Sequence, residues 1–245
     1  MGIKLNDYEK ETKLAIKRFW KSRNAATDKQ AQAGVLDQGT RGAVTAGKNM
    51  DGFADMLENL VRVNGLKEAE VVKVGKLVTL PGYFRPTKMW DLLVIHEEEL
   101  VAAIEFKSQV GSLGNNFNNR TEEAIGTAHD LSVAFQEGAF GEQVRPFIGW
   151  FMLLEDVEKS RNPVKDNSPH FPTFPEFNQA SYSQRYDILC KKMVQEQLYS
   201  SACLLLSPAT AVKTGKYNCL SEMTNLKTFV TSFAGHIAAV SARKK

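Results

Sequence analysis

The stretch KMWDLLVIHEEELVAAIEFK, residues 88–107, decides the fold of this chain. It contains two apolar runs, residues 89–95 and 100–106, which are separated by the polar segment HEEE at residues 96–99. The length of each run, its content of Leu, Val, Ile and Phe, and the polar break between the runs predict a β-hairpin. We therefore expect two strands that lie in a buried sheet.

Each of these apolar runs carries one carboxylate, Asp91 in the first and Glu105 in the second. If the turn is centred on Glu98, the numbers of paired residues sum to a constant, and Asp91 lies opposite Glu105. Side chains alternate between the two faces of a strand, so Lys107 shares a face with Glu105. Two facing carboxylates repel each other and are costly to desolvate, and a bound hard cation such as Mg²⁺ removes that cost. The hairpin therefore predicts a metal site with an ammonium group beside it.

The same residues have a simpler interpretation. Asp91 could face solvent, and Glu105 could form an ordinary ion pair with Lys107 on one face of the strand. The apolar neighbours on both sides of each carboxylate favour burial, and burial favours the metal site. A further acidic candidate is Glu58, at the edge of the apolar stripe of a predicted helix at residues 50–66. Its position leaves open whether it is a surface residue or an additional metal ligand.

Length and composition bound the class of protein. With 245 residues, of which 43% are hydrophobic, the chain can bury the core of one large domain. Its formal charge of +3 does not by itself indicate a polyanionic partner. The spacing of Cys190, Cys203 and Cys219 predicts reduced thiols rather than disulfides or a zinc site. A charged start and the lack of any apolar run near the ~20 residues of a membrane helix predict a cytoplasmic protein that does not enter a membrane.

The predicted helices and strands are interspersed along the chain. We expect helices at residues 6–32, 50–66, 121–135, 183–199 and 222–243, and strands at 70–80, 89–95, 100–106, 145–154 and 202–206. This order predicts an α/β fold in which a central mixed sheet is flanked by helices. We expect a single domain with three parts: an N-terminal helix and loop (1–47), a catalytic core (48–160), and a proline-rich segment followed by C-terminal helices (161–245).

A segment rich in glycine, serine and asparagine, residues 108–120, follows the second strand of the hairpin and predicts a flexible loop. Amides and arginines can donate to phosphates and read purine edges through paired hydrogen bonds. Asparagine also favours turns and caps, which leaves a structural role open. The position of the segment, directly after Lys107, favours contact with DNA. The predicted DNA-binding residues, including two cations upstream of the hairpin, are Arg85, Lys88, Gln109, Asn115, Asn116, Asn118, Asn119 and Arg120.

These residues carry a resemblance to a known family. A proline-containing bend, Asp91, and Glu105-x-Lys107 across a hairpin resemble the PD-(D/E)xK nuclease core. The wider stretch at residues 79–131, from TLPGYFRPTKMWD to NNRTEEAIGTAHDL, resembles the XhoI family of type II restriction endonucleases. One departure from the short motif is Trp90 immediately before Asp91, with the proline further upstream at Pro86.

The resemblance implies a Mg²⁺-dependent homodimer, bacterial and cytoplasmic, that hydrolyses double-stranded DNA at the palindrome CTCGAG. The products would have 5′ overhangs and 5′-phosphates. The resemblance assigns Asp91 and Glu105, with the carbonyl of Phe106, to metal binding, and Lys107 to catalysis. Two other classes of function stay open: a repair or junction-resolving nuclease on the same fold, and a DNA-binding protein that cuts nothing.

Overall fold

The computed structural model describes residues 2–32 and 49–243, so the predicted connection at residues 34–47 lies outside the described part of the chain. A five-stranded sheet with the strand order β1-β4-β5-β6-β7 forms the centre of the molecule. β1 and β4 pair antiparallel, as do β4 and β5, whereas β5, β6 and β7 are parallel. The prediction of a central mixed sheet is confirmed. The five strands are β1 (Glu70–Val72), β4 (Leu92–His96), β5 (Glu99–Gln109), β6 (Phe147–Glu155) and β7 (Ser201–Ser207).

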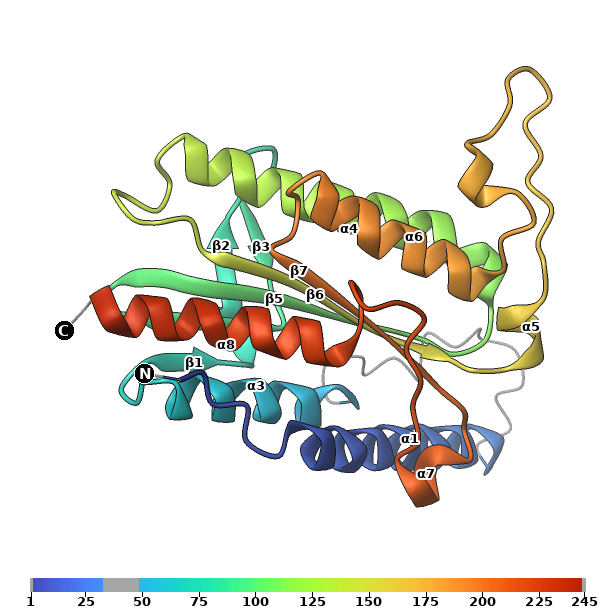
Figure 1. Cartoon of the computed structure of the whole chain (residues 1–245), viewed down its shortest axis with the longest axis horizontal. Coiled ribbons are helices and arrows are strands. Elements are labelled where there is room, and N and C mark those ends of the chain that lie inside the picture. Colours follow the sequence, from blue (N-terminus) through green and yellow to red (C-terminus); the bar gives the residue numbers. More distant parts are fainter. Residues whose placement is uncertain (1, 33–48, 244–245) are drawn as a thin grey trace.

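Helices cover both faces of this sheet (Figure 1). α4 (Leu113–Gln136) and α6 (Tyr182–Gln195) lie on one face, and α1 (Tyr8–Gln32), α3 (Asp51–Val63) and α8 (Leu226–Arg243) lie on the other. Because β7 belongs to the segment 161–245, the central sheet is not confined to residues 48–160. No helix in the described ranges is long and apolar enough to span a membrane. The remaining elements are β2 (Thr79–Pro81), β3 (Thr87–Met89), α5 (Glu158–Arg161), α7 (Ala211–Thr214) and two short 3-10 helices, η1 (Gly75–Val78) and η2 (Pro175–Phe177).

The strand β6 is buried along eight of its nine residues because its sequence is a continuous apolar run. Phe151 points to the face covered by α3 and α8, where its ring lies 4.9 Å from that of Phe53 and 5.5 Å from that of Phe229. Its neighbour Trp150 belongs to the core under α4 and α6. Glu105 is in register with Trp150 across the parallel pair, so its side chain lies on the α4 and α6 face.

The hairpin of β4 and β5 has the predicted register near the site and a different one at the turn. Leu92 pairs with Ile104, as a turn centred on Glu98 requires. The turn itself consists of two residues, Glu97 and Glu98, with φ of 49° and 65°, as a two-residue type I′ turn requires. A register shift within β4 compensates for the displaced turn. The predicted register therefore holds from Leu92 to Val94, whereas Asp91 lies just before β4 and outside the ladder.

Besides the strand at 89–95, which is described below, two of the predicted segments are wrong. The expected strand at 70–80 is broken into β1, η1 and β2, and Gly75 at its middle has a φ of +74°. The expected flexible loop at 108–120 is the end of β5 followed by the first turns of α4, which begins at Leu113 rather than at Thr121. Leu113 is buried, and the ring of Phe117 packs at 5.1 Å from that of Tyr186 on α6. This packing outweighs the weak helix propensity of glycine and asparagine.

Candidate active site

Asp91 lies at a bend where the chain passes from one sheet to the other. The predicted strand at 89–95 is divided here, because Met89 pairs with Thr79 in the small sheet of β2 and β3, and β4 begins only at Leu92. The side chain of Asp91 accepts a hydrogen bond of 2.7 Å from the backbone N–H of Phe106 on β5. The bend therefore holds this carboxylate against the middle of the central sheet.

Glu105 lies between two lysines. It is 4% exposed, and its Oε1 accepts a hydrogen bond of 2.6 Å from the ammonium group of Lys107. Its Oε2 accepts one of 2.7 Å from Lys88, which comes from β3 in the small sheet. The side chains of both lysines are 13% exposed. The structure therefore brings Glu105 and Lys107 together as the alternating faces of a strand predict, and it adds a second cation, Lys88, at the other oxygen.

The charge network continues onto α4 through Glu123. The ammonium of Lys107 lies 2.8 Å from Glu123, and the guanidinium of Arg120 lies 3.0 Å from the other oxygen of the same carboxylate. Glu123 is not among the predicted site residues, because a loop at residues 108–120 followed by a helix from Thr121 gives it no defined position relative to β5. With the helix beginning at Leu113, Glu123 is far enough along α4 to reach back to β5.

Burial and charge shift the pKa values of this cluster in a way that matters for function. Burial, together with the neighbouring charge of Glu105, raises the pKa of Asp91 to about 6. Burial alone would lower the pKa of Lys107, but the carboxylates of Glu105 and Glu123 outweigh it and hold that pKa above its usual value. Lys107 is therefore positively charged at neutral pH, whereas the surroundings of Asp91 disfavour its ionised form.

The oxygen atoms present are ligands of the kind that Mg²⁺ uses. The described residues contain no group of three or more His, Cys, Asp or Glu that could hold a metal ion. Mg²⁺ differs from zinc and calcium in commonly using only one or two carboxylates, its other ligands being water and substrate phosphate. Asp91 and Glu105 supply that number. In an antiparallel pair, the N–H and C=O of a residue point to the same neighbour, so the carbonyl of Phe106 points to the side where its N–H meets Asp91.

The cations predicted to bind DNA are engaged in ion pairs within the protein. Lys88 binds Glu105, and Arg120 binds Glu123. Arg85 lies 2.7 Å from the buried carboxylate of Asp130 on α4. Any contact of these three side chains with a phosphate therefore has to compete with an existing partner.

Among the amide side chains predicted to contact DNA, some are exposed and others are buried or hydrogen-bonded within the protein. Gln109 is 4% exposed, which argues against a base contact. Asn116 donates to the carbonyl of Ser112 and is half-buried. Asn115, Asn118 and Asn119 are exposed on the first turns of α4. The segment thus presents its amides from a helix rather than from a flexible loop.

Glu58, the additional metal candidate, is placed in a different group of charges. Its carboxylate lies 2.8 Å from Lys73 and 3.1 Å from Arg62, and these contacts lower its pKa despite its partial burial. The acidic residue of α3 that lines a cavity with Asp91 is Asp51, at the start of the helix. That cavity, of about 250 Å³, also contains the side chains of Trp90, Phe106 and other apolar residues.

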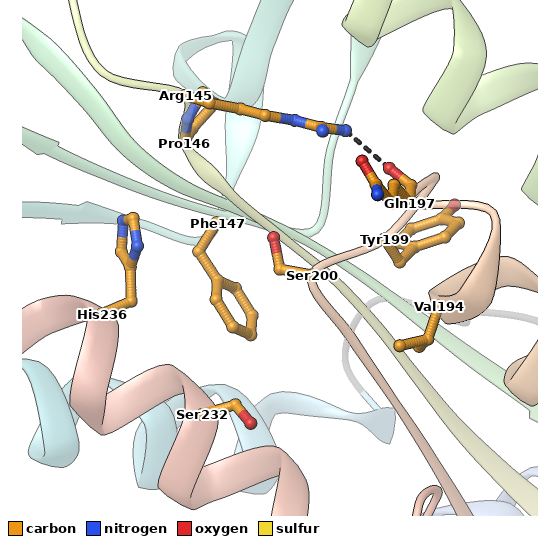
Figure 2. Close-up of a pocket in the computed structure, with 9 residues that line it drawn as sticks. All are labelled: Arg145, Pro146, Phe147, Val194, Gln197, Tyr199, Ser200, Ser232 and His236. Carbon is orange, nitrogen blue, oxygen red and sulfur yellow. Dashed lines mark hydrogen bonds between the residues drawn. The ribbon is translucent and has the colours of Figure 1, made fainter.

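A larger cavity of about 400 Å³ lies at the amino-terminal ends of β6 and β7 (Figure 2). No carboxylate lines it. Arg145 donates to the carbonyl of Gln197, and His236 is within 3.0 Å of the carbonyl of Val101. Its polar groups are thus used in holding strand ends and helices together, and it offers no ligand set for a metal.

Comparison with known proteins gives consistent results. A model of the family "Restriction endonuclease XhoI" matches residues 29–219. The chain is 50% identical over 214 residues to the type II restriction enzyme XhoI of Xanthomonas vasicola, a match that covers 86% of each chain. It is 56% identical over 172 residues to the type II restriction enzyme AbrI of Azospirillum brasilense, covering 70% of this chain and 77% of AbrI. It is 48% identical over 217 residues to the type II restriction enzyme BstVI of Geobacillus stearothermophilus, covering 86% and 96%. No solved structure matches the chain.

Proposed function

Because the chain belongs to the XhoI family of type II restriction endonucleases, we propose that it hydrolyses double-stranded DNA at the palindrome CTCGAG, using Asp91, Glu105 and Lys107 with Mg²⁺. The observation that carries the assignment of the site is the buried cluster around Glu105. Its carboxylate is in contact with Lys107 and lies beside Asp91, whose pKa it raises. The repair-nuclease and non-cutting alternatives have no comparable support among the relatives.

The carboxylates of Asp91 and Glu105, with the carbonyl of Phe106, are the groups that would hold Mg²⁺. Mg²⁺, when bound, activates water and neutralises charge that builds up on the phosphate. A cation held there would offset the repulsion between Asp91 and Glu105 and would favour the ionised form of Asp91 near neutral pH. The backbone N–H of Phe106 keeps Asp91 in place in either state.

Lys107 supplies a fixed positive charge on the same face as Glu105. As a cation it donates hydrogen bonds, stabilises the negative charge that develops on the phosphate, and orients or helps to deprotonate the attacking water. Attack in line with the scissile bond expels the 3′ oxygen and leaves a 5′-phosphate. Glu123 holds Lys107 from the other side and thereby restricts where its ammonium group can lie.

The exposed amides of α4 are our candidates for part of the sequence readout. Asn115, Asn118 and Asn119 lie at the start of the helix that follows the catalytic strand. A helix can enter the major groove, and an asparagine can make two hydrogen bonds to an adenine edge. A palindromic target also implies two-fold symmetry, so we expect two copies of the chain on one site.

A plasmid digest tests this function. Purified protein with Mg²⁺ and a plasmid of known sequence should give discrete fragments that end at CTCGAG, with 5′ overhangs found by end sequencing. A smear would indicate a non-specific nuclease, and branch-specific cuts would indicate a junction-resolving one. Intact plasmid in the presence of Mg²⁺, together with retained DNA binding, would contradict the proposed chemistry.

A further inference from the structure

Lys88 is a second lysine on the catalytic glutamate, and no motif of the chain assigns it a role there. Its ammonium group lies 2.7 Å from Oε2 of Glu105 and 2.8 Å from the carbonyl of Met89. It also lies 4.9 Å from the centre of the Trp90 ring. Its side chain is 13% exposed, so the ion pair is largely shielded from water. A lysine meant only for a phosphate would be expected to extend into solvent.

The two lysines of the site are held differently. Lys107 stands on β5, at the centre of the main sheet, and has a second carboxylate partner in Glu123 at 2.8 Å. Lys88 stands on β3, in a separate two-stranded sheet, and its contacts besides Glu105 are a carbonyl and a ring. If one ammonium group leaves Glu105, Lys88 is therefore the one with the weaker remaining contacts.

Lys88 occupies the oxygen of Glu105 that Lys107 leaves available. A divalent cation held by Asp91 and Glu105 would be repelled by an ammonium group at this oxygen. Before a metal binds, however, the same ammonium group offsets the charge of two neighbouring carboxylates. Lys88 and a metal ion thus serve the same electrostatic purpose and compete for one position.

We propose that Lys88 is an exchangeable counter-ion, which holds Glu105 in the metal-free protein and leaves it when a divalent cation binds. This makes Lys88 a positioning residue that sets the affinity of the site for the metal. The inference rests on the proposed function, in which Asp91 and Glu105 hold that cation. It predicts that the loss of the lysine improves metal binding in the absence of DNA, whereas the loss of a phosphate-binding or purely structural lysine would leave metal binding unchanged or weaken it.

The test is calorimetric titration of Mn²⁺ into the full chain without DNA, for the wild type and for Lys88→Met. We expect Lys88→Met to bind Mn²⁺ about tenfold more tightly, because one neighbouring positive charge has been removed. Lys191→Met is the matched control: it removes the same charge from an ion pair 2.6 Å long with Asp187 on α6 and should bind Mn²⁺ like the wild type. Lys88→Gln, which keeps a donor for the carbonyl of Met89, serves as a second neutral variant if Lys88→Met does not fold.

The outcomes separate this inference from the proposed function. If the wild type binds Mn²⁺, Asp91→Asn binds it more weakly, and the neutral variants of Lys88 bind it no better than the wild type, Lys88 is not a competitor and the inference is wrong while the metal site stands. If the wild type binds no Mn²⁺, or Asp91→Asn binds it equally well, the metal site itself is wrong and the inference is overturned with it.

Discussion

Asp91 and Asp130 are two aspartates of the same molecule whose pKa values are shifted in opposite directions. The carboxylate of Asp130 accepts hydrogen bonds from the backbone N–H groups of Tyr83 and Phe84, at 2.9 and 2.8 Å, and from Arg85 at 2.7 Å. Burial acts to raise its pKa, but these donors outweigh burial and lower it. Asp91 accepts from one backbone N–H group, and burial with the charge of Glu105 raises its pKa to about 6.

The difference shows how a buried carboxylate can serve two purposes. The hydrogen-bond donors to Asp130 all belong to the turn between β2 and β3. Asp130 therefore binds this turn to α4 and is a structural residue. Asp91 has one backbone donor and a negative neighbour, Glu105, so its ionised form is disfavoured in the metal-free protein. At Asp130 the hydrogen-bond donors outweigh burial, whereas at Asp91 burial and the charge of Glu105 outweigh the single backbone donor.

The largest expected effect is on cleavage. Asp91→Asn should lower the single-turnover rate of cleavage at CTCGAG by roughly a thousandfold or more, since metal assistance contributes several kcal/mol to phosphoryl chemistry. Specific binding of the duplex, measured by gel shift in Ca²⁺, should survive. Asp130→Asn, which keeps a hydrogen-bond acceptor for the turn between β2 and β3, should have a cleavage rate within about tenfold of that of the wild type. Equal losses in the two variants would remove the distinction between the two aspartates.

The next effect is on stability. Asp130→Ala leaves two backbone N–H groups and Arg85 without their acceptor, and we expect the free energy of unfolding to fall by about 2–3 kcal/mol, less than for a fully buried pair because Arg85 is partly exposed. Urea unfolding of the metal-free protein measures it. Asp55→Ala, which removes a half-exposed partner of Lys73, should cost less than about 1 kcal/mol. A loss at Asp130 no larger than that at Asp55 would contradict its structural role.

The smallest effect, and the one of opposite sign, concerns Asp91 and pH. Its folded pKa of about 6 lies above the usual 3.8, so the folded state binds the proton more tightly than the unfolded state does. The stability that this proton provides is fully present below about pH 4 and is lost as the pH rises through about 6. Asn mimics the protonated form at every pH.

Metal-free Asp91→Asn should therefore be as stable as the wild type at pH 4 and more stable by about 2 kcal/mol at pH 7.5. Thermal unfolding in a chelator at the two pH values measures this difference. A variant that is less stable than the wild type at pH 7.5 would show that the surroundings of Asp91 favour its ionised form, and the comparison with Asp130 would fail.

The sequence by itself determined the central hairpin and the proximity of Glu105 and Lys107 on one of its strands. Apolar runs 89–95 and 100–106 with one carboxylate each were enough to place Asp91 near Glu105, because side-chain alternation and hairpin register are local rules. The turn is centred between Glu97 and Glu98 rather than on Glu98, but the register shift in β4 restores the predicted pairing of Leu92 with Ile104. The alternation of strands and helices was likewise enough for the α/β class.

Only the tertiary structure decided which charges meet. Lys88 reaches Glu105 from a different sheet, Glu123 reaches Lys107 from α4, and Arg85 is fastened to Asp130, across gaps of 16 to 45 residues in the chain. The first turns of α4 form because their apolar side chains pack against α6, since glycine and asparagine by themselves disfavour a helix. Partners set by packing between distant segments leave no local pattern, so periodicity and spacing could predict that Lys107 lies beside Glu105 but not that Lys88 and Glu123 join them.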